Sequence, residues 1–474
     1  MGFTPTTVTS DREADSLSLA RSIRQKWRDR MNRFFFAKLT FILGRIIFFA
    51  QVPALGAHRK HAMTATLPLL LGILANALPG ADWPEFRGAG AAGLAPGRFP
   101  VQDGNFPAPD WTVPVPGQGW SSPVIRDGLL VLTAAVPEGD PARQWIFVVL
   151  GLDPATGKQR FRTTVFERPA DSLPKIHSKN SHASPTPVLT ERGIVVHFGH
   201  VGTALVDNLG KVLWRTEGLY SKPVHGGGAS PVVVAGKVLI PCDGLDLQAL
   251  VALDLKTGKE AWRLDRKAGA SKTFSFATPC PNGENNGKVL SAASDILQQV
   301  DAATGKEIWR FPYSGYSVVP RPYQVSGDLA VLSTGYDKPR LLCIRLGDLK
   351  AGQDRLAWSI EKNAPLTPTP LMVDGRLLVL ADNGVLSALE PETGKQLWQE
   401  RLQGAYSASP ILAGKQVLSV SETGKVTVFT AGDKFSRAAS FELKDRSLAS
   451  PAVAGGWLYI RGEKGLAAWK MRAD

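Results

Sequence analysis

The feature that most constrains the fold is a phrase that the chain repeats with small changes: VALDLKTGKEAWR at residues 251–263, then VDAATGKEIWR and ALEPETGKQLWQ. The apolar residues before the turn fall on both faces of an extended chain, as in a strand that is covered on both sides. Asp254 can accept hydrogen bonds from the backbone N–H groups that follow it, and Gly258 can adopt the positive φ that closes the turn. A second short strand then carries Trp262. The phrase therefore predicts a β-hairpin.

A second phrase, a small residue followed by proline and an apolar run, precedes each hairpin and occurs eight times. Its prolines are Pro123, Pro185, Pro231, Pro279, Pro320, Pro370, Pro410 and Pro451. They lie 40 to 62 residues apart, and a period in the forties with about four short strands per unit is typical of a propeller blade. The sequence predicts an all-β fold, an eight-bladed β-propeller of four-stranded blades over residues 109–474, preceded by an N-terminal segment at 82–108.

An aromatic residue on the outer strand of each unit is expected to wedge between neighbouring blades, and its burial contributes about 1.5–3 kcal/mol. The residues expected in this docking role are Trp111, Phe161, Trp214, Trp262, Trp309, Trp358 and Trp398. The seventh unit is degenerate, and Phe441 is the expected substitute. The eighth unit ends after three strands, so an N-terminal strand around Trp111 is expected to complete the last blade, which removes a free sheet edge.

Charge is unevenly placed along the chain. The formal net charge is +13, but residues 1–62 hold 11 Lys and Arg against 4 Asp and Glu, a balance of +7 that leaves +6 for the other 412 residues. A mildly basic body of this kind carries no electrostatic footprint for nucleic acid, so nucleic-acid binding is not expected.

Two apolar stretches near the N-terminus bear on localisation. Residues 63–81 have the apolar core, the preceding basic residues and the small-residue cleavage site of a secretory signal peptide, which predicts a secreted or periplasmic protein. Residues 34–50 are also apolar but contain Lys38 and Arg45. Residues 1–62 are therefore either the product of a start codon assigned too early or a membrane anchor. We favour the former because a charge within a span is costly, and membrane association is expected only in the latter case.

The three cysteines, Cys242, Cys280 and Cys343, lie far apart in strand-like contexts. An odd, scattered set of this kind is neither a disulfide framework nor a zinc site, so buried thiols are expected. No Ser-His-Asp set has the context of a nucleophile elbow, and no pair of carboxylates stands out as an acid and a base. The sequence therefore predicts no catalytic residue, and the cysteines predict no metal site.

Candidate ligand-binding residues gather around the small-residue–proline phrases, which are expected near the channel mouth. They are Lys179, Asn180, His182, His225, Tyr316, Arg321, Tyr336, Asp337 and Tyr406. Five of the seven histidines lie between His177 and His225, a set that suits an anion, another small ligand or a metal. The tyrosines and the arginine suit peptide or sugar recognition. The alternative is structural: histidines that cap solvated loops, tyrosines that pack between blades, and Arg321 paired with a neighbouring acid.

The hairpins DPATGKQRF, LDLKTGKEAW, DAATGKEIW and EPETGKQLW resemble the pyrroloquinoline-quinone (PQQ) repeat. That repeat is shared by quinoprotein alcohol dehydrogenases and by the propeller lipoprotein of the outer-membrane assembly machinery, and the resemblance covers most of residues 110–474. The segments ADWPEFRG, SHASPTPV, HGGGASPV and YSVVPRP also look like those of secreted bacterial PQQ-like propellers. The resemblance implies the propeller architecture.

The chain departs from both groups that share the repeat. Alcohol-type quinoprotein dehydrogenases use two adjacent cysteines beside the quinone and hold calcium with a Glu, an Asn and an Asp, and neither motif can be matched here. The lipidated cysteine of the assembly lipoprotein is also absent. PQQ with calcium is therefore an alternative cofactor and not the expected one.

We expect a secreted or periplasmic, monomeric, non-catalytic scaffold that binds a protein or peptide partner. The alternatives are a periplasmic quinone- or metal-dependent oxidoreductase and a module that binds a sugar or another small ligand.

Overall fold

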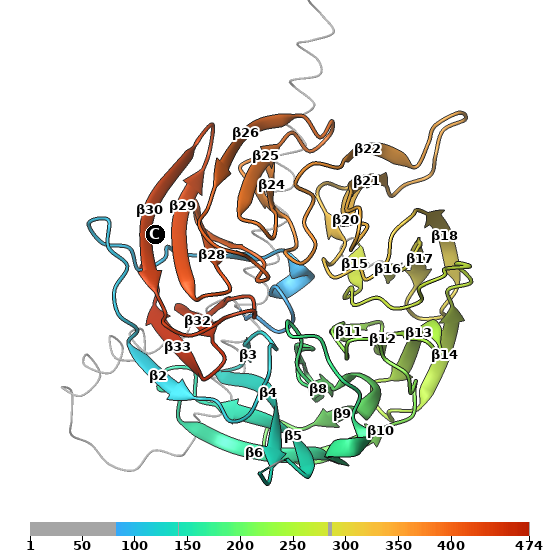
Figure 1. Cartoon of the computed structure of the whole chain (residues 1–474), viewed down its shortest axis with the longest axis vertical. Coiled ribbons are helices and arrows are strands. Elements are labelled where there is room, and N and C mark those ends of the chain that lie inside the picture. The colour runs from blue at the N-terminus through green and yellow to red at the C-terminus, as the bar shows by residue number, and fades with distance from the viewer. Residues whose placement is uncertain (1–81, 141, 283–286, 474) are drawn as a thin grey trace, which may run out of the picture. The chain divides into compact units, whose positions relative to one another are not determined.

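The computed structural model describes residues 82–140, 142–282 and 287–473. These residues form eight sheets arranged in a ring, seven of four strands and one of five (Figure 1). The fold is therefore the predicted all-β, eight-bladed β-propeller. Helix in the described residues is limited to three short 3₁₀ turns: η1 (Ala89–Ala91), η2 (Ala170–Ser172) and η3 (Gly199–Val201).

Each sheet is one blade, and the blades are numbered here along the chain. Blade 1 contains β3 (Val124–Arg126), β4 (Leu129–Glu138), β5 (Gln144–Leu152) and β6 (Gln159–Pro169). Blade 2 contains β7 (Val188–Thr190), β8 (Gly193–His197), β9 (Thr203–Val206) and β10 (Val212–Thr216). Blade 3 contains β11 (Val232–Val234), β12 (Lys237–Asp243), β13 (Gln248–Asp254) and β14 (Glu260–Asp265). Blade 4 contains β15 (Cys280–Asn282), β16 (Lys288–Ala293), β17 (Ile296–Asp301) and β18 (Glu307–Pro312).

The second half of the ring repeats this order. Blade 5 contains β19 (Tyr323–Gln324), β20 (Leu329–Ser333), β21 (Leu341–Arg345) and β22 (Leu356–Ile360). Blade 6 contains β23 (Leu371–Val373), β24 (Arg376–Leu380), β25 (Val385–Leu389) and β26 (Gln396–Arg401). Blade 7 contains β1 (Leu94–Ala95), β27 (Ile411–Ala413), β28 (Gln416–Val420), β29 (Lys425–Ala431) and β30 (Phe435–Glu442). Blade 8 contains β2 (Trp111–Pro114), β31 (Ala452–Ala454), β32 (Trp457–Arg461) and β33 (Gly465–Lys470).

The N-terminal strand completes the last blade, as predicted. β2 pairs with β33 in antiparallel register, with Trp111 opposite Ala468, and in Figure 1 the light-blue β2 lies beside the red β33. The ring is thereby closed by hydrogen bonds between segments more than three hundred and fifty residues apart, and β33 is not an edge strand.

The T-G-K hairpins form the predicted turns. In blade 3, Asp254 Oδ1 accepts hydrogen bonds from the backbone N–H groups of Lys256 and Thr257, both at 3.1 Å. Gly258 has φ +71°, and a Cβ at this position would lie 2.6 Å from the ring of Trp214 in blade 2. The glycine is therefore required by the turn and also by the close approach of the neighbouring indole.

Four of the outer-strand indoles share one docking contact. Each indole N–H donates to a carbonyl oxygen at the hairpin of the next blade: Trp214 to Leu255 (3.0 Å), Trp262 to Ala302 (3.1 Å), Trp358 to Pro391 (2.9 Å) and Trp398 to Gly432 (3.0 Å). Gly258, Gly305 and Gly394 of these hairpins lie against the rings of Trp214, Trp262 and Trp358, and Trp111 and Phe161 rest on Gly157 and Gly210 in the same way. Trp309 instead lies beneath the guanidinium of Arg355, 4.2 Å from the ring centre. The repeated aromatic residues therefore join neighbouring blades.

Blade 7 differs from the prediction. The position that matches the docking tryptophan, the residue after the β-bulge opposite Val428, is held by Ala439 and not by Phe441. Phe441 lies two residues further along β30 and packs against Phe106 and Trp469, with the ring centroids 5.9 Å away in both cases. Phe441 nevertheless contacts the next blade, because Trp469 lies on β33, and Phe106 from the segment before β2 packs against both rings.

The first strands also correct the register of two phrases. In six blades the first strand begins directly after the predicted proline, but β7 begins after Pro187 and β19 begins after Pro322. The predicted Pro185 and Pro320 lie two residues too early because HASPTPVL and SVVPRPY each contain two prolines at this spacing. With the corrected register, Arg321 occupies the position of the small residue in blade 5.

The N-terminal segment does not lie outside the propeller but inside it. Residues 82–99, called the plug from here on, enter the centre of the ring, where η1 appears as the blue turn in Figure 1. Trp83 pairs with Ile125 at the end of β3 and is 2% exposed. β1 then runs parallel to β27 as an extra innermost strand. The plug leaves beside Arg472, at the end of the blades where the T-G-K hairpins lie.

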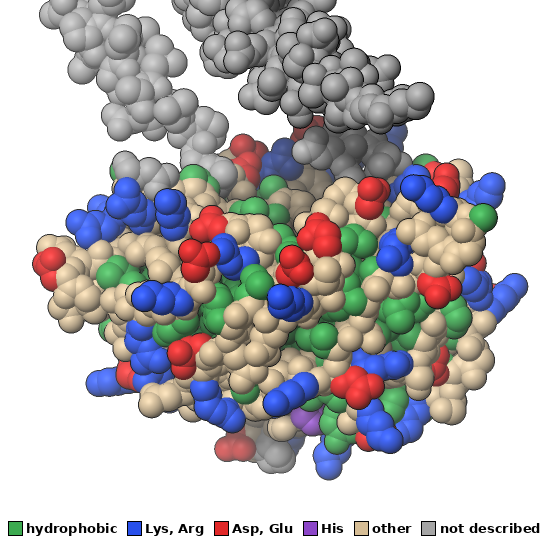
Figure 2. All heavy atoms as spheres, turned by 90° about the horizontal axis from the view of Figure 1, so that it is seen from above, with side chains coloured by type: hydrophobic (Ala, Val, Ile, Leu, Met, Phe, Trp, Pro, Cys, Tyr) green, Lys and Arg blue, Asp and Glu red, His purple; other side chains and the backbone are tan. Residues whose placement is uncertain are grey.

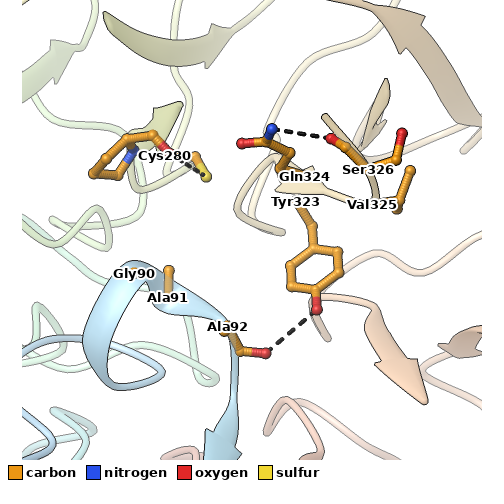
Figure 3. Close-up of a pocket in the computed structure, with 9 residues that line it drawn as sticks. Gly90, Ala91, Ala92, Cys280, Tyr323, Gln324, Val325 and Ser326 are labelled. Carbon is orange, nitrogen blue, oxygen red and sulfur yellow. Dashed lines mark hydrogen bonds between the residues drawn. The ribbon is translucent and has the colours of Figure 1, made fainter. Parts of the chain in front are cut away.

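A small cavity of about 260 Å³ remains between the plug and blades 4 and 5 (Figure 3). Its lining is Gly90, Ala91, Ala92, Cys280, Pro281, Tyr323, Gln324, Val325 and Ser326. In Figure 3 the ring of Tyr323 points toward the plug, where its hydroxyl donates to the carbonyl oxygen of Ala92 at 3.4 Å.

Neither the surface charge nor the predicted N-terminal segments constrain the fold further. Lys and Arg side chains are mixed with Asp and Glu over the edge of the propeller that Figure 2 shows. Within the described residues, no helix has the length and apolar character needed to cross a membrane. The predicted signal at 63–81 and the apolar stretch at 34–50 lie outside those residues.

Candidate functional site

The residues that precede the first strands form a ring inside the channel. In seven blades this residue carries a hydroxyl: Ser122, Thr186, Ser230, Thr278, Thr369, Ser409 and Ser450. These residues, called the hydroxyl ring from here on, are between 1% and 5% exposed. All seven line one cavity of about 650 Å³, which we call the pocket.

Backbone hydrogen bonds link the hydroxyl ring from blade to blade. Six residues donate a backbone N–H to the hydroxyl of the next blade, at 2.9–3.1 Å: Ser122 to Thr186, Thr186 to Ser230, Ser230 to Thr278, Arg321 to Thr369, Thr369 to Ser409 and Ser409 to Ser450. The series is interrupted at blade 5, because Arg321 has no hydroxyl for Thr278 to reach, and also between Ser450 of blade 8 and Ser122 of blade 1.

The plug closes the pocket at its inner end. Phe86 lines the pocket, and its carbonyl oxygen accepts a hydrogen bond from Arg321 Nη1 at 3.1 Å. Arg321 Nη2 lies 3.5 Å from Glu85 Oε2. Arg87 is 1% exposed and donates to three carbonyl oxygens at the start of blades 6 and 7 at 2.9–3.2 Å. The pocket is therefore blind, with a floor made by Phe86 and the hydroxyl ring.

Aromatic rings cover the wall of the pocket over blades 2 to 5. A chain of edge-to-face pairs, with centroids 5.6–6.1 Å apart, joins His177, His225, Phe274, Tyr316 and Tyr336. Tyr336 is 61% exposed at the mouth. The ammonium of Lys272 lies 4.1 Å from the centre of the Tyr316 ring, which is a cation–π contact. We call these five rings the aromatic wall.

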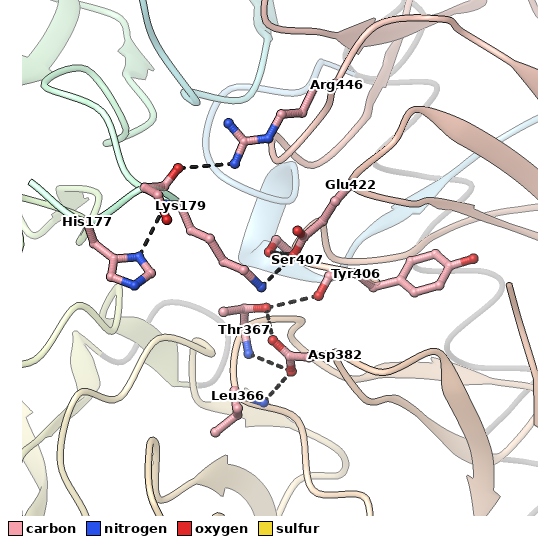
Figure 4. Close-up of polar contacts among 10 residues, drawn as sticks. His177, Lys179, Leu366, Thr367, Asp382, Tyr406, Ser407, Glu422 and Arg446 are labelled. Carbon is pink, nitrogen blue, oxygen red and sulfur yellow. Dashed lines mark hydrogen bonds and ion pairs between the residues drawn. The ribbon is translucent and has the colours of Figure 1, made fainter. Parts of the chain in front are cut away.

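The opposite side of the pocket is polar, and one loop reaches it from across the channel. Residues 173–181, called the crossing loop, connect blades 1 and 2, yet Lys179 forms an ion pair of 2.7 Å with Glu422 of blade 7 (Figure 4). Arg446, between blades 7 and 8, donates to the carbonyl oxygen of Ser178 at 3.1 Å. Asn180 anchors the other end by donating to the carbonyl oxygen of His225 at 2.8 Å. The crossing loop is thus tied on both sides of the mouth.

Two carboxylates, Glu422 and Asp382, belong to this polar network, and both accept hydrogen bonds from the protein (Figure 4). Burial by itself would raise the pKa of Glu422, but hydrogen bonds from Lys179 and Ser407 outweigh it and lower that pKa. Burial raises the pKa of Asp382, although its oxygens accept hydrogen bonds from the Thr367 hydroxyl and from the N–H groups of Leu366 and Thr367 at 2.5–3.2 Å. Glu422 is therefore paired with an ammonium, whereas the groups that donate to Asp382 are uncharged and the charge of Lys179 acts on it without a hydrogen bond.

Three of the thirteen non-glycine residues with positive φ in the described part of the chain lie beside the aromatic wall. His225, Ser317 and Asp337 have φ values of +60°, +55° and +80°, a region that residues with a side chain rarely adopt. Each such residue costs about 1–3 kcal/mol unless its surroundings compensate, and residues of this kind cluster at functional sites.

The structure brings five of the nine predicted ligand-binding residues to the pocket. They are Lys179, Asn180, His225, Tyr316 and Tyr336. Asp337 does not line the pocket but follows Tyr336 at the mouth. His182 packs against Trp145 and Phe147, with ring centroids 5.1 and 6.3 Å away, and burial lowers its pKa.

The other two predicted residues have structural roles. Arg321 lies under the floor, paired with Glu85 of the plug. Tyr406 is fully buried between blades 6 and 7, where its hydroxyl donates to the carbonyl oxygen of Gln403 at 3.0 Å. For both residues the structural alternative raised from the sequence is the one observed.

Several pocket residues were not predicted. They are Phe86, Trp120, Lys272, Phe274, Phe276, Ser407, Asp382 and the hydroxyl ring. Glu422, which does not line the pocket but binds its residues Lys179 and Ser407, was not predicted either. Part of this set could have been predicted from its sequence position relative to the hydroxyl ring. Phe274 lies four residues before Thr278, and Trp120 lies two before Ser122. Nothing local in the sequence marks Glu422, because its partner Lys179 is 243 residues away.

The pocket does not fit the quinone and calcium of quinoprotein dehydrogenases. Cys242, Cys280 and Cys343 are buried and free, burial raises the pKa of each thiol, and none of them lines the pocket. Asp382 and Glu422 already accept hydrogen bonds from the protein. Within the described residues there is no group of three or more His, Cys, Asp and Glu placed to hold a metal ion.

Comparison with known families decides the relationship of the chain. The family model described as Outer membrane protein assembly factor BamB matches residues 142–343 and 294–472, well over half of the chain. The chain belongs to this family. Its PQQ-like repeats are therefore those of BamB-type propellers, and the resemblance seen in the hairpins is confirmed.

Individual BamB proteins are distant relatives. The chain is 26% identical to outer membrane protein assembly factor BamB of Yersinia pestis over 340 residues, which cover 68% of this chain and 69% of that protein. It is 27% identical to the BamB of Legionella pneumophila over 201 residues, and there it spans only 49% of the relative.

Solved structures share the fold at low identity. The crystal structure of BamB from Moraxella catarrhalis has a TM-score of 0.52 at 14% identity, covering 77% of this chain and 98% of that one. Quinohemoprotein alcohol dehydrogenase from Comamonas testosteroni has a TM-score of 0.61 at 12% identity, covering 85% of this chain and 82% of that one. At such identities the likeness establishes the propeller fold alone.

Proposed function

We propose that this chain is a non-catalytic scaffold of the periplasm that binds a protein or peptide partner in the pocket. The names of its family and relatives refer to outer membrane protein assembly, so the partner class is an outer membrane protein before insertion or another assembly factor. The signal-peptide pattern at residues 63–81 agrees with a periplasmic location, and the scaffold acts as a monomer.

The observation that carries the proposal is the combination of a blind pocket with an aromatic wall that reaches its mouth. Aromatic side chains that are partly exposed around a concave site are the usual anchors of peptide and protein recognition. Tyr336 and Tyr316 line the pocket near its mouth. The residues that follow them, Asp337 and Ser317, have the strained backbone described above. The engaged carboxylates and the buried thiols favour binding over catalysis.

The proposal is tested with a defined peptide. A fluorescent peptide that copies one membrane strand of an outer-membrane β-barrel, with apolar and polar residues alternating, is titrated into the purified full chain and followed by anisotropy. Tyr316→Ala and Tyr336→Ala are each expected to weaken binding about tenfold or more, because buried aromatic anchors carry most of the affinity of such sites.

The matched control lies at the other end of the blades. Leu209 is 87% exposed at the turn between β9 and β10, so Leu209→Ala removes a similarly exposed apolar side chain away from the pocket. Unchanged affinity in this variant, with loss in the tyrosine variants, fits the proposal. Equal loss in all three variants, or no saturable binding by the wild type, contradicts it.

The oxidoreductase alternative has its own test. PQQ and calcium are added to the full chain while thermal unfolding is followed. A specific site at one hundred times its Kd would stabilise the fold by about 2.7 kcal/mol. We expect no calcium-dependent shift; a clear one would favour the enzyme.

A further inference from the structure

The floor of the pocket contains hydrogen-bond donors that the protein does not use. A serine or threonine hydroxyl has one proton to donate and two lone pairs to accept with. Six of the seven hydroxyls in the ring accept a backbone N–H from the neighbouring blade. Among the described residues, none of the seven donates its proton to another protein group, although they are at most 5% exposed.

A buried donor without an acceptor costs free energy, so these protons need acceptors from outside the protein. The seven hydroxyls line the same pocket and are held in place by their blade-to-blade bonds. They therefore surround one region of the pocket, to which seven blades contribute a hydroxyl each. A group that carries several acceptor lone pairs on adjacent oxygens matches such an arrangement better than a group with one acceptor.

The charges beneath the floor have the sign that such a group requires. Arg87 and Arg321 lie under the ring, and Glu85 supplies one compensating carboxylate. Burial lowers the pKa of Arg87 to about 10 and raises the pKa of Glu85. Arg87 therefore stays charged at neutral pH, and at least one positive charge is in excess below the floor. In a partly buried site this field is screened much less than at the surface.

The charged groups that line the pocket do not reverse this sign. Lys179 is paired with Glu422, and Lys272 lies over Tyr316 at the mouth. Asp382 is the one carboxylate in the lining, and both of its oxygens already accept hydrogen bonds from the protein. It opposes an anion, but it lies on the polar side and not in the ring.

Above the floor the pocket becomes apolar. Phe274, Phe276, Val319 and Leu448 line it between the hydroxyl ring and the mouth. A ligand that fills about 650 Å³ therefore meets donors and positive charge at one end and apolar side chains along its length. Pockets of this size bind small molecules in this way, with a few polar groups that fix the orientation.

We propose that the hydroxyl ring binds an oxyanion group, a carboxylate or a phosphate, that is carried on an apolar or aromatic body. This deepens the proposed function and rests on the pocket being the binding site: it assigns the chemical group that a ligand or a partner's chain places on the floor.

The probes of the experiment separate charge, shape and apolar body. Benzoate, phenyl phosphate and the neutral benzyl alcohol are titrated into the purified full chain by calorimetry. We expect one of the two anions to bind at least tenfold more tightly than benzyl alcohol, because hydrogen bonds to a charged group are the stronger ones. The better anion distinguishes a planar carboxylate from a tetrahedral phosphate. Equal binding of the alcohol and the anions, or binding of none, overturns the proposal.

Three variants test the ring itself. Thr369→Val removes a hydroxyl with little change of shape and is expected to weaken binding of the better anion about tenfold. Thr369→Ser keeps the hydroxyl and is expected to stay within about twofold of wild type. Ser419→Ala is the control, because Ser419 is fully buried in blade 7 but does not line the pocket. Unchanged affinity in Thr369→Val, or equal loss in Ser419→Ala, contradicts the assignment.

A second ring variant guards against a folding defect. Thr369→Val also removes the acceptor of the Arg321 N–H, so Ser122→Ala is measured beside it, because Ser122 is the one ring hydroxyl that accepts none of the six blade-to-blade N–H groups. Thermal unfolding is recorded for both. Peptide binding in the same proteins separates the two proposals. If the peptide binds through Tyr336 but anion affinity is unchanged in the ring variants, only the floor assignment fails. If the anions depend on the ring and the peptide does not bind, only the scaffold proposal fails.

Discussion

The outer edge of the propeller, called the rim from here on, repeats one contact between neighbouring blades, whereas most residues of the central channel differ from blade to blade. At the rim, the T-G-K hairpin of one blade receives the aromatic ring of the blade before it, and this contact is repeated with small changes. In the channel, only the hydroxyl ring is repeated, and the loops beyond it differ from blade to blade: His225 in one, Phe274 in the next, Tyr316 in the one after.

The difference shows how a repeat protein divides its tasks. A contact that every blade makes contributes to the stability of the whole ring, and its residues are constrained in every copy. A position that varies among copies is free of that constraint and can be used for recognition. We therefore expect substitutions at the rim to change stability more than binding, and substitutions in the channel to do the reverse.

The largest effect on stability is expected from the rim. Trp262→Ala removes a large ring wedged between blades 3 and 4, together with its hydrogen bond to Ala302, and should lower the free energy of unfolding by about 3–5 kcal/mol. Tyr336→Ala, at an exposed channel residue, should change it by no more than about 0.5 kcal/mol. Urea unfolding of both variants measures the comparison, and similar losses would break it.

The plug is the strongest test of this division between rim and channel, because one of its partners is a channel residue with an expected role in stability. Arg321 lies in the channel but is 1% exposed and paired with Glu85, so Arg321→Met should leave a largely buried carboxylate without its partner and cost about 3 kcal/mol. Urea unfolding is the measurement, with Arg321→Met, Glu85→Gln as the paired control that should recover part of the loss. A cost below about 0.5 kcal/mol would mean that the plug does not stabilise the ring.

Two glycines in blade 6 test the rim contact in a matched way. Gly394 and Gly375 have φ values of +72° and +74°, so alanine strains the backbone equally at both. A Cβ at Gly394 would lie 2.7 Å from the ring of Trp358, whereas a Cβ at Gly375 has no atom within 4 Å. Gly394→Ala should therefore cost about 1–3 kcal/mol more than Gly375→Ala, by the same urea assay. Equal costs would show that the indole yields to the added methyl group.

The smallest effect on stability is expected from the crossing loop. Lys179→Met removes a partly exposed ion pair and should cost no more than about 1 kcal/mol at neutral pH. The sign with pH follows from Glu422, whose pKa is lowered in the folded state. Its contribution is complete above the unfolded pKa of about 4.5 and is lost as the pH falls through the lower folded pKa. Unfolding curves from pH 7 to pH 3 should therefore converge for wild type and variant, and a gap that grows on acidification would contradict this assignment.

Much of the fold was predictable because its signals are local. An Asp-x-x-Thr-Gly-Lys turn satisfies its own backbone, and the strand that follows carries the docking ring a fixed number of residues later. The small-residue–proline phrase that precedes the hairpins occurs eight times, which predicts eight blades. The errors were local too. Two prolines spaced two residues apart leave the start of β7 and of β19 ambiguous, and a degenerate seventh hairpin concealed that Phe106 takes part in its packing.

The pocket was predictable only in part. Lys179, His225 and Tyr316 lie next to a small-residue–proline phrase and could be assigned to the mouth. The same reasoning failed for Tyr406 and Arg321, because proximity to the phrase does not say whether a side chain turns toward the channel or into the layer between blades. It also could not reveal the plug, whose partners come from blades 1, 2, 5, 6 and 7.

The amino-acid sequence by itself determined the repeat, the number of blades and the closure of the last one, because each depends on contacts within a hairpin or on a pattern that recurs at a fixed spacing. Only the tertiary structure decided that the N-terminal segment seals the channel, that a lysine between blades 1 and 2 meets a glutamate of blade 7, and that seven hydroxyls converge on one floor. Those arrangements bring together residues that are hundreds of positions apart in the sequence. They depend on the closure of the ring, and no short sequence pattern predicts which of these residues meet.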